Sequence, residues 1–269
     1  MSVTIDDPVW QRILDETCEQ ARAEPVLAGY LHATIINHAS LEHALSFHLA
    51  NQLDSPAASA LLLRDVMEEA LCDDSCLRKT VRADLLAVLE RDSACDELYI
   101  PFLYFKGFHA LQTHRVAHWL WNRERHSMAL FLQNRMSAEF GVDIHPAAKL
   151  GHGLMLDHAT GLVIGETTVV GNNVSILQSV TLGGTGKEHG DRHPKIGNGV
   201  LISAGAKILG NIRVGDGAKV GAGSVVLEDV PPHTTVAGVP AKIVGRPATE
   251  APALEMDHDF CCDSSSEKK

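Results

Sequence analysis

The sequence predicts an α+β protein in which an all-helical N-terminal domain is followed by a parallel β-helix. Three observations lead to this. Helical patterns fill residues 1–140, aliphatic residues recur at almost every sixth position from Ile144 to Val226, and the composition changes after Gly245. A period of six fits neither the 3.6-residue helix nor the two-residue strand, but it is the signature of hexapeptide repeats.

The helical domain, residues 1–140, divides at its capping signals. Asp7-Pro8 reads as an N-cap followed by proline at the first helical position, and Ser55-Pro56 repeats that pattern. Ser40 is expected to cap a helix that runs to about Leu53. Further helices are expected at about 57–71, 76–91, 101–121 and 126–139. Aromatic residues crowd the 101–121 segment and indicate core or a subunit interface.

The repeat domain, residues 141–245, carries its aliphatic residues in three runs with one phase each. Three hexapeptides form one triangular coil of about 18 residues, in which the aliphatic side chain points inward and glycine helps the chain turn a corner. The three runs are Ile144, Leu150, Leu156 and Leu162; Ile164, Val170, Ile176 and Leu182; and Ile196, Ile202, Ile208, Val214, Val220 and Val226.

Two breaks in this phase matter. The step from Leu162 to Ile164 is a slip of two residues, which predicts a small corner adjustment. The step from Leu182 to Ile196 is rich in glycine and charge and has no apolar period, so it predicts a loop that leaves the prism. Loops on rigid scaffolds often carry function, and Arg192 and His193 favour that interpretation over a neutral insertion.

Composition narrows the class of protein. The chain has 269 residues and a net charge of −11, which argues against a nucleic-acid partner. It has no apolar run long enough to span a membrane and no basic or apolar start, so we expect a soluble cytoplasmic protein with no membrane partner. The six cysteines lack metal-ligand spacing and fit reduced thiols. Residues 246–269, rich in Pro, Ala, Glu, Asp and Ser, are expected to form a disordered tail.

A polar cluster marks the start of the prism. Asp143 precedes an inward-facing position, and Asp157 and His158 follow one. Advancing Asp143 by one coil of three hexapeptides places it over position 161, close to His158, because stacked coils lie about 4.8 Å apart. Such a carboxylate would orient the imidazole as a general base. The alternative is a surface histidine beside a turn aspartate.

Six stretches of the chain carry a resemblance to a known family. They are Asp143–Ala148, Leu156–Gly161, Ile176–Lys187, Asp191–Ile196 and Val236–Ala241, together with Lys106–Gln112 in the helical part. These stretches resemble bacterial serine O-acetyltransferases. The resemblance covers residues 8 to about 247 and includes the helical domain, which distinguishes this family from other hexapeptide acyltransferases.

This resemblance implies a fold and a reaction. The helical domain is followed by a left-handed β-helix, prisms associate as homotrimers, and helical domains join two trimers into a hexamer. Active sites lie between neighbouring prisms. The enzyme transfers the acetyl group of acetyl-CoA, its co-substrate, to L-serine in cysteine biosynthesis, and L-cysteine is the expected feedback inhibitor. No tightly bound cofactor and no metal are expected.

The resemblance also assigns roles to residues. His158, oriented by Asp143, removes the proton from the serine hydroxyl, and His193 is the second essential imidazole. Arg192 is expected to hold the serine carboxylate, and Asp92 and Asp157 its ammonium group.

For acetyl-CoA, we expect pantetheine contacts along the groove between prisms and phosphate contacts from basic side chains. The pantetheine candidates are Gly184, Ala204, Gly205 and Ala222, and the phosphate candidates are Lys219, Lys242 and Arg246. A complex with O-acetylserine sulfhydrylase is doubtful, because relatives that form it end in isoleucine whereas this chain ends in Lys269. Cys261 and Cys262 are expected to be inert.

Three other functions stay open on sequence alone. A related acetyltransferase for another hydroxyl acceptor would keep His158 without the Asp92, Asp157 and Arg192 clamp. A β-helical carbonic anhydrase would bind zinc through three histidines, for which His145, His152 and His158 are the candidates. A non-enzymatic trimeric scaffold would need none of these clusters.

Overall fold

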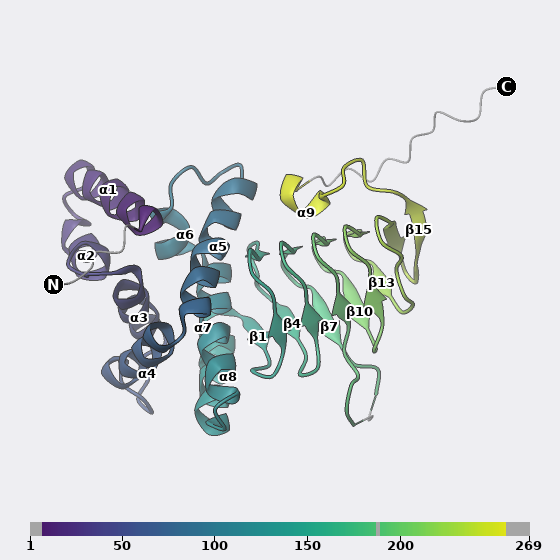
Figure 1. Cartoon of the computed structure of the whole chain (residues 1–269), viewed down its shortest axis with the longest axis horizontal. Coiled ribbons are helices and arrows are strands. Elements are labelled where there is room, and N and C mark those ends of the chain that lie inside the picture. The colour runs from purple at the N-terminus through teal and green to yellow at the C-terminus, as the bar shows by residue number, and fades with distance from the viewer. Residues whose placement is uncertain (1–6, 187–188, 257–269) are drawn as a thin grey trace.

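The computed structural model describes residues 7–186 and 189–256. The helical domain packs against the first coil of a prism built from short parallel strands, and α7 and α8 lie nearest that coil (Figure 1). The fold is the predicted α+β arrangement of a helical domain and a left-handed parallel β-helix. In the described part of the chain, no helix is long and apolar enough to cross a membrane.

The helical domain follows most of the predicted boundaries. Asp7 Oδ1 accepts a hydrogen bond from the Trp10 N–H at 3.2 Å and caps α1, and Ser40 caps α3. The helices are α1 (Pro8–Ala23), α2 (Ala28–Leu31), the π-helical turn η1 (His32–Ile36), α3 (Leu41–Gln52), α4 (Ala60–Asp73), α5 (Ser75–Arg91), α6 (Tyr99–Tyr104), α7 (Lys106–Trp121) and α8 (His126–Phe140).

Two helical predictions were wrong. Ser55-Pro56 does not begin a helix, since Ser55 forms a tight turn with Ala58 and α4 begins at Ala60. The expected helix 101–121 is two helices, because Phe105 has extended backbone angles (φ −91°, ψ 103°) that separate α6 from α7. Most of the aromatic side chains in this region are core or partly buried, as expected.

The prism has three sheets, and the chain visits them in turn. The first contains β1 (Val142–Ile144), β4 (Leu162–Ile164), β7 (Thr181–Gly183), β10 (Lys207–Leu209) and β13 (Val225–Val226). The second contains β2 (Lys149–Leu150), β5 (Val169–Val170), β8 (Lys195–Ile196) and β11 (Arg213–Val214). The third contains β3 (Met155–Leu156), β6 (Ser175–Ile176), β9 (Leu201–Ile202), β12 (Lys219–Val220), β14 (Thr235–Gly238) and β15 (Ala241–Gly245). The predicted sixfold positions mostly point into the prism and form its core.

The register corrects one step of the sequence interpretation. Asp143 pairs with Val163 and not with position 161, so the first coil is longer than three plain hexapeptides. The extra residues lie in the corner between β3 and β4, where His158, Ala159 and Gly161 all have positive φ. A slip in phase therefore marks the widened corner that carries His158.

A buried ion pair of the helical domain contacts the prism. The Asp84 carboxylate of α5 is fully buried and accepts bonds from Arg115 Nε at 2.7 Å and from Arg115 Nη2 at 3.0 Å. It also accepts from the Gln112 amide and from the backbone N–H of Leu154 in the first coil. On α7, Gly107 permits close packing, because a side chain there would overlap with the Leu156 carbonyl. These contacts hold α5 and α7 against the first coil.

Part of the expected disordered tail is folded. After β15 the chain returns across the third sheet, and α9 (Pro252–Glu255) contacts α5. Ala253 is fully buried, and its carbonyl accepts a hydrogen bond from the Ser175 hydroxyl at 2.8 Å. Lys269, Cys261 and Cys262, on which the sulfhydrylase and thiol expectations rest, lie outside the described residues.

Candidate active site

A pocket of about 230 Å³ brings three predicted site residues together. Asp92, just after α5, lines this pocket together with Asp157 and His158, which follow β3. Its walls come from both domains: Val88, Tyr104, Phe105, Lys106, Gly107, Phe108, Met155 and Leu156. The Lys106 ammonium donates to the Thr160 hydroxyl and ties α7 to the same corner. Two half-buried carboxylates beside an apolar wall suit a small ligand with an ammonium group.

His158 stands at the mouth of this pocket, with its side chain 77% exposed. Its Nε2 lies 3.8 Å from Asp157 Oδ1. Asp143 is not hydrogen-bonded to this imidazole among the described residues; its Oδ1 accepts from Gln133 Nε2 at 2.7 Å. The structure thus brings His158 together with Asp92 and Asp157, whereas the expected contact with Asp143 is not formed.

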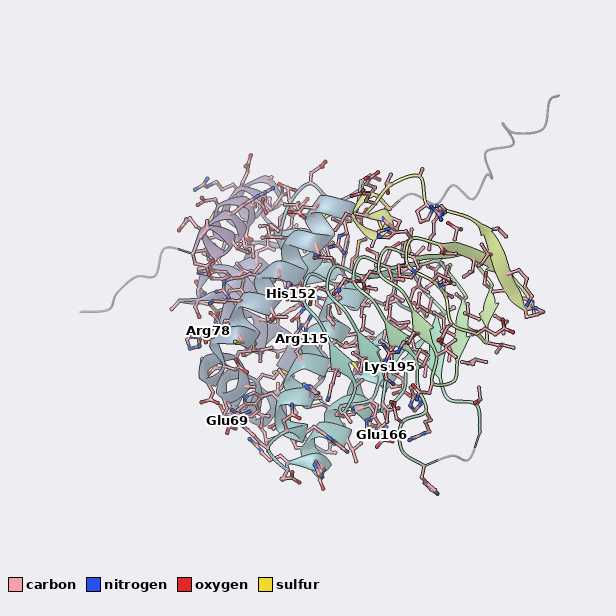
Figure 2. The ribbon with its side chains drawn as sticks, turned by 45° about the vertical axis from the view of Figure 1, so that its right-hand side comes forward. Glu69, Arg78, Arg115, His152, Glu166 and Lys195 are labelled. Atoms are coloured by element: carbon pink, nitrogen blue, oxygen red, sulfur yellow. The ribbon has the colours of Figure 1, made fainter. Side chains whose placement is uncertain are left out.

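Arg192 and His193 lie at the next edge of the prism, where the loop after β7 returns to β8. Figure 2 labels Glu166 and Lys195 at this edge, where Lys195 Nζ donates to the carbonyl of Thr167, the residue after Glu166. Arg192 Nη2 donates to Glu166 Oε2 at 2.6 Å, and this guanidinium holds the pKa of Glu166 below its usual range. His193 is 7% exposed, and burial, together with nearby Arg192 and Lys195, lowers its pKa. The imidazole of His193 is therefore neutral at pH 7.

The His158 group and the Arg192 group lie at opposite edges of the first sheet, which contains β1, β4, β7, β10 and β13. We call the corners after β3, β6, β9 and β12 the His158 edge, and the corners after β4, β7 and β10 the loop edge. Within one coil, β4 (Leu162–Ile164) separates them. At about 3.3 Å per residue, the stretch from Gly161 to Glu166 spans roughly 15 Å. One chain does not bring His158 and Arg192 to the two ends of a small amino acid.

The structure separates the acetyl-CoA candidates into accessible and inaccessible ones. Ala204, Gly205 and Ala222 line up along the His158 edge, and Gly184 lies beside Arg192 on the loop edge. Lys242 and Arg246 are exposed near the last hairpin. Lys219 does not fit the expected phosphate contact in this chain, because its side chain is fully buried. It lies on the third sheet, the face that the C-terminal segment crosses.

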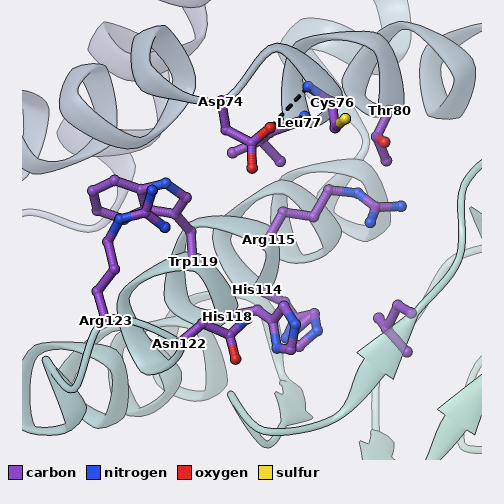
Figure 3. A pocket seen from close by; sticks show the side chains of 11 residues that line it. Asp74, Cys76, Leu77, Thr80, His114, Arg115, His118, Trp119, Asn122 and Arg123 are labelled. Atoms are coloured by element: carbon purple, nitrogen blue, oxygen red, sulfur yellow. Dashed lines mark hydrogen bonds between the residues drawn. The ribbon is translucent and has the colours of Figure 1, made fainter.

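A second cavity, of about 220 Å³, contains none of the predicted residues (Figure 3). It lies between the first turn of α5 and the end of α7. Its charged side chains already have structural partners: Asp74 caps α5, Arg115 pairs with Asp84, and Arg123 stacks on Trp119 with 3.9 Å between the guanidinium and the ring centre. We regard this cavity as part of the domain junction.

The zinc alternative finds no ligand set. His145 follows β1, His152 follows β2 and His158 follows β3, so the three histidines occupy three different corners. Throughout the described ranges, no group of three or more His, Cys, Asp and Glu side chains is arranged to hold a metal ion.

Comparison with known proteins decides between the remaining functions. A family model described as serine acetyltransferase, N-terminal, matches residues 9–113, and a bacterial transferase hexapeptide model (six repeats) matches residues 193–228. The serine acetyltransferase of Escherichia coli K12 is 59% identical over 252 residues, covering 94% of this chain and 92% of that protein. The chain belongs to the serine acetyltransferase family.

Solved serine acetyltransferases share the whole architecture. The Vibrio cholerae structure has a TM-score of 0.93 and 58% identity, and covers 94% of this chain and 98% of that one. Other similar structures are complexes with serine from soybean, with coenzyme A from Brucella abortus, and with cysteine. As a serine acetyltransferase, the protein moves the acetyl group of acetyl-CoA to the hydroxyl of L-serine in cysteine biosynthesis.

Sequence reasoning assigned no site role to several residues that hold the candidate site residues in place. Glu166 and Thr167, in the corner after β4, anchor Arg192 and His193, and Phe105 and Lys106 help to form the pocket on the other edge. Nothing in the hexapeptide pattern distinguishes Glu166 and Thr167 from ordinary corner residues. Their position over the long loop, one coil away, was the available signal.

Proposed function

We propose that the serine site is completed by two copies of the chain. The observation that carries this proposal is the split just described, with Asp92, Asp157 and His158 on one edge and Arg192 and His193 on the other. In a closed homotrimer, the His158 edge of one copy faces the loop edge of its neighbour. Exposed apolar side chains of the helical domain, such as Val26 (89%) and Leu61 (70%), offer a surface for joining two trimers.

The proposed mechanism is direct acyl transfer. Asp92 and Asp157 hold the serine ammonium, and Arg192 from the neighbouring copy holds its carboxylate through charge-assisted hydrogen bonds. His158 takes the hydroxyl proton as the oxygen attacks the thioester carbonyl. The C–S bond then breaks, and the proton passes from His158 to the departing CoA sulfur. Donors near Gly184 stabilise the oxyanion between these steps.

Asp143 keeps the orienting role as a proposal. It lies on β1, directly beside β4, and the Gly161 N–H bonds the Gly141 carbonyl two residues before it. This places Asp143 next to the corner that carries His158. In the free chain its Oδ1 accepts a hydrogen bond from Gln133, and the proposed role requires a carboxylate oxygen of Asp143 to bond the His158 imidazole when substrate is bound.

Acetyl-CoA is proposed to lie along the His158 edge, over the small corner residues Ala204, Gly205 and Ala222. Lys242 and Arg246 are the phosphate contacts that remain.

Cysteine differs from serine only in the side-chain atom, and we assign it to the same pocket as a feedback inhibitor. The described cysteines are free thiols, in keeping with a reducing cytoplasm.

Arg192→Ala tests the acceptor assignment. Losing charge-assisted bonds to the carboxylate costs about 1.5–3 kcal/mol, so the KM for L-serine should rise about 10- to 100-fold. The readout is thiol release from acetyl-CoA. 2-Aminoethanol, which has no carboxylate, should be a poor substrate for the wild type and for Arg192→Ala. The substitution should change its KM very little. Arg213→Ala, an exposed arginine of the same prism, serves as the control. An unchanged KM for L-serine would contradict the assignment.

A further inference from the structure

Thr167 holds the end of the loop through all of its polar groups. Its hydroxyl oxygen accepts from the backbone N–H groups of Arg192 at 3.0 Å and of His193 at 3.1 Å. Its carbonyl accepts from Lys195 Nζ at 2.9 Å, and its own N–H points to His193 Nδ1 at 3.2 Å. The corner after β4 therefore fixes both the backbone and the imidazole at position 193.

These contacts determine which ring nitrogen of His193 carries the proton. A backbone N–H can only donate, so Nδ1 must be the acceptor of the Thr167 N–H. The Thr167 hydroxyl is 2.9 Å from the same nitrogen, and because its oxygen already accepts two N–H groups, its proton can be donated to Nδ1 or to the nearby Asp191 carboxylate. A flipped ring would place a C–H against both donors.

The imidazole has little freedom to change this arrangement. Its ring lies against Gly165, where any side chain would overlap with Cδ2 and Nε2. The charged groups near the ring are Arg192, Lys195 and Glu166, with His145 beyond them. Burial and the two cations together outweigh Glu166 and keep the ring neutral. A neutral imidazole with an unprotonated Nδ1 carries its single proton on Nε2.

We propose that Thr167 is a positioning residue that holds His193 as the Nε2–H tautomer, so that His193 donates a hydrogen bond to an anionic oxygen of the substrate. In this state Nε2 cannot accept the serine proton, and Nδ1 is occupied. The two histidines of the site then have distinct tasks, with His158 as the base and His193 as a donor. The assignment of tasks rests on the proposed function, whereas the tautomer follows from the free chain alone.

The tautomer is measured directly on the full-length free enzyme labelled with ¹⁵N-histidine, by magic-angle-spinning NMR. The spectrum of His193→Ala identifies the His193 signals. We expect an unprotonated, hydrogen-bonded Nδ1 and a protonated Nε2 at pH 7.5. A proton on Nδ1 would overturn the proposal. In Thr167→Val the Nδ1 signal should move towards that of a nitrogen with one fewer hydrogen bond, whereas Thr167→Ser should leave it in place; an unmoved signal in Thr167→Val overturns the role of Thr167.

Activity tests the donor role separately. A glutamine amide can donate from nearly the same place as Nε2–H but cannot take a proton. We therefore expect kcat/KM to fall about 100-fold in His193→Ala and only about 10-fold in His193→Gln. Equal losses in the two variants would overturn the donor role. A fully active His193→Ala enzyme would contradict the proposed placement of His193 in the serine site. It would leave the tautomer of the free enzyme, which NMR measures independently, unaffected.

Discussion

Replacing His158 with alanine should lower kcat by about 1,000-fold or more while acetyl-CoA still binds. General-base catalysis contributes about 10²- to 10⁴-fold, and the deprotonated serine hydroxyl is the only nucleophile in the proposed mechanism. The exposed side chain of His158 makes few packing contacts, so its removal should leave the fold unchanged. Turnover is measured by thiol release at saturating L-serine, and CoA binding by calorimetry.

His152→Ala is the matched control for this experiment. His152 is also an exposed corner histidine of the first coil, but it follows β2 and does not line the pocket. It should have wild-type turnover. Near-normal activity of His158→Ala would remove this residue from the mechanism. Loss of CoA binding would show that the substitution disturbs the structure of the CoA site and does not simply remove the general base.

Asp84→Ala should lower the free energy of unfolding by about 3–5 kcal/mol, the largest effect on stability that we expect from one substitution. It leaves Arg115, only 8% exposed, without its carboxylate partner inside the domain junction. Asp84→Asn keeps an acceptor for the Leu154 N–H and should have an intermediate effect. The measurement is the urea midpoint at fixed protein concentration.

Asp73→Ala provides the control for Asp84. Asp73 also pairs with an arginine of the helical domain, but both side chains of the Asp73–Arg123 pair are largely exposed, at 57% and 43%. Exposed pairs of this kind contribute about 1 kcal/mol or less. Similar midpoints for Asp73→Ala and Asp84→Ala would contradict the view that the buried pair holds the two domains together.

The hexapeptide period predicted most of the fold because each coil repeats one local requirement. An aliphatic side chain must point inward at every strand, so Ile164, Ile176 and Leu182 share one sixfold phase. The helix caps at Asp7 and Ser40 were equally local. Ser55 failed because the same two-residue signal also suits a tight turn, and only packing decides between them.

The site was harder to predict because it depends on what lies across coils and domains. The sequence predicted Asp92, Asp157 and His158 as site residues, and the structure brings them to one pocket, but the longer first coil shifted the partner of Asp143 from position 161 to Val163. Lys219 looked accessible because the sequence does not show a C-terminal segment crossing the third sheet. Thr167 acts through its backbone as much as through its side chain, which no residue pattern records.

Subunit mixing tests the central claim, a serine site shared between copies, most directly. His158→Ala and Arg192→Ala chains, each almost inactive alone at low L-serine, are co-expressed with different tags, and the mixed oligomers are isolated. Every trimer that contains both kinds of chain has one site in three that pairs the intact His158 edge of one chain with the intact loop edge of another, so about one third of wild-type activity should return in mixed trimers. If each site were instead built from both edges of one chain, every site would carry one of the two substitutions. Mixed oligomers would then be no more active than the two parent variants, and that result would contradict a shared site.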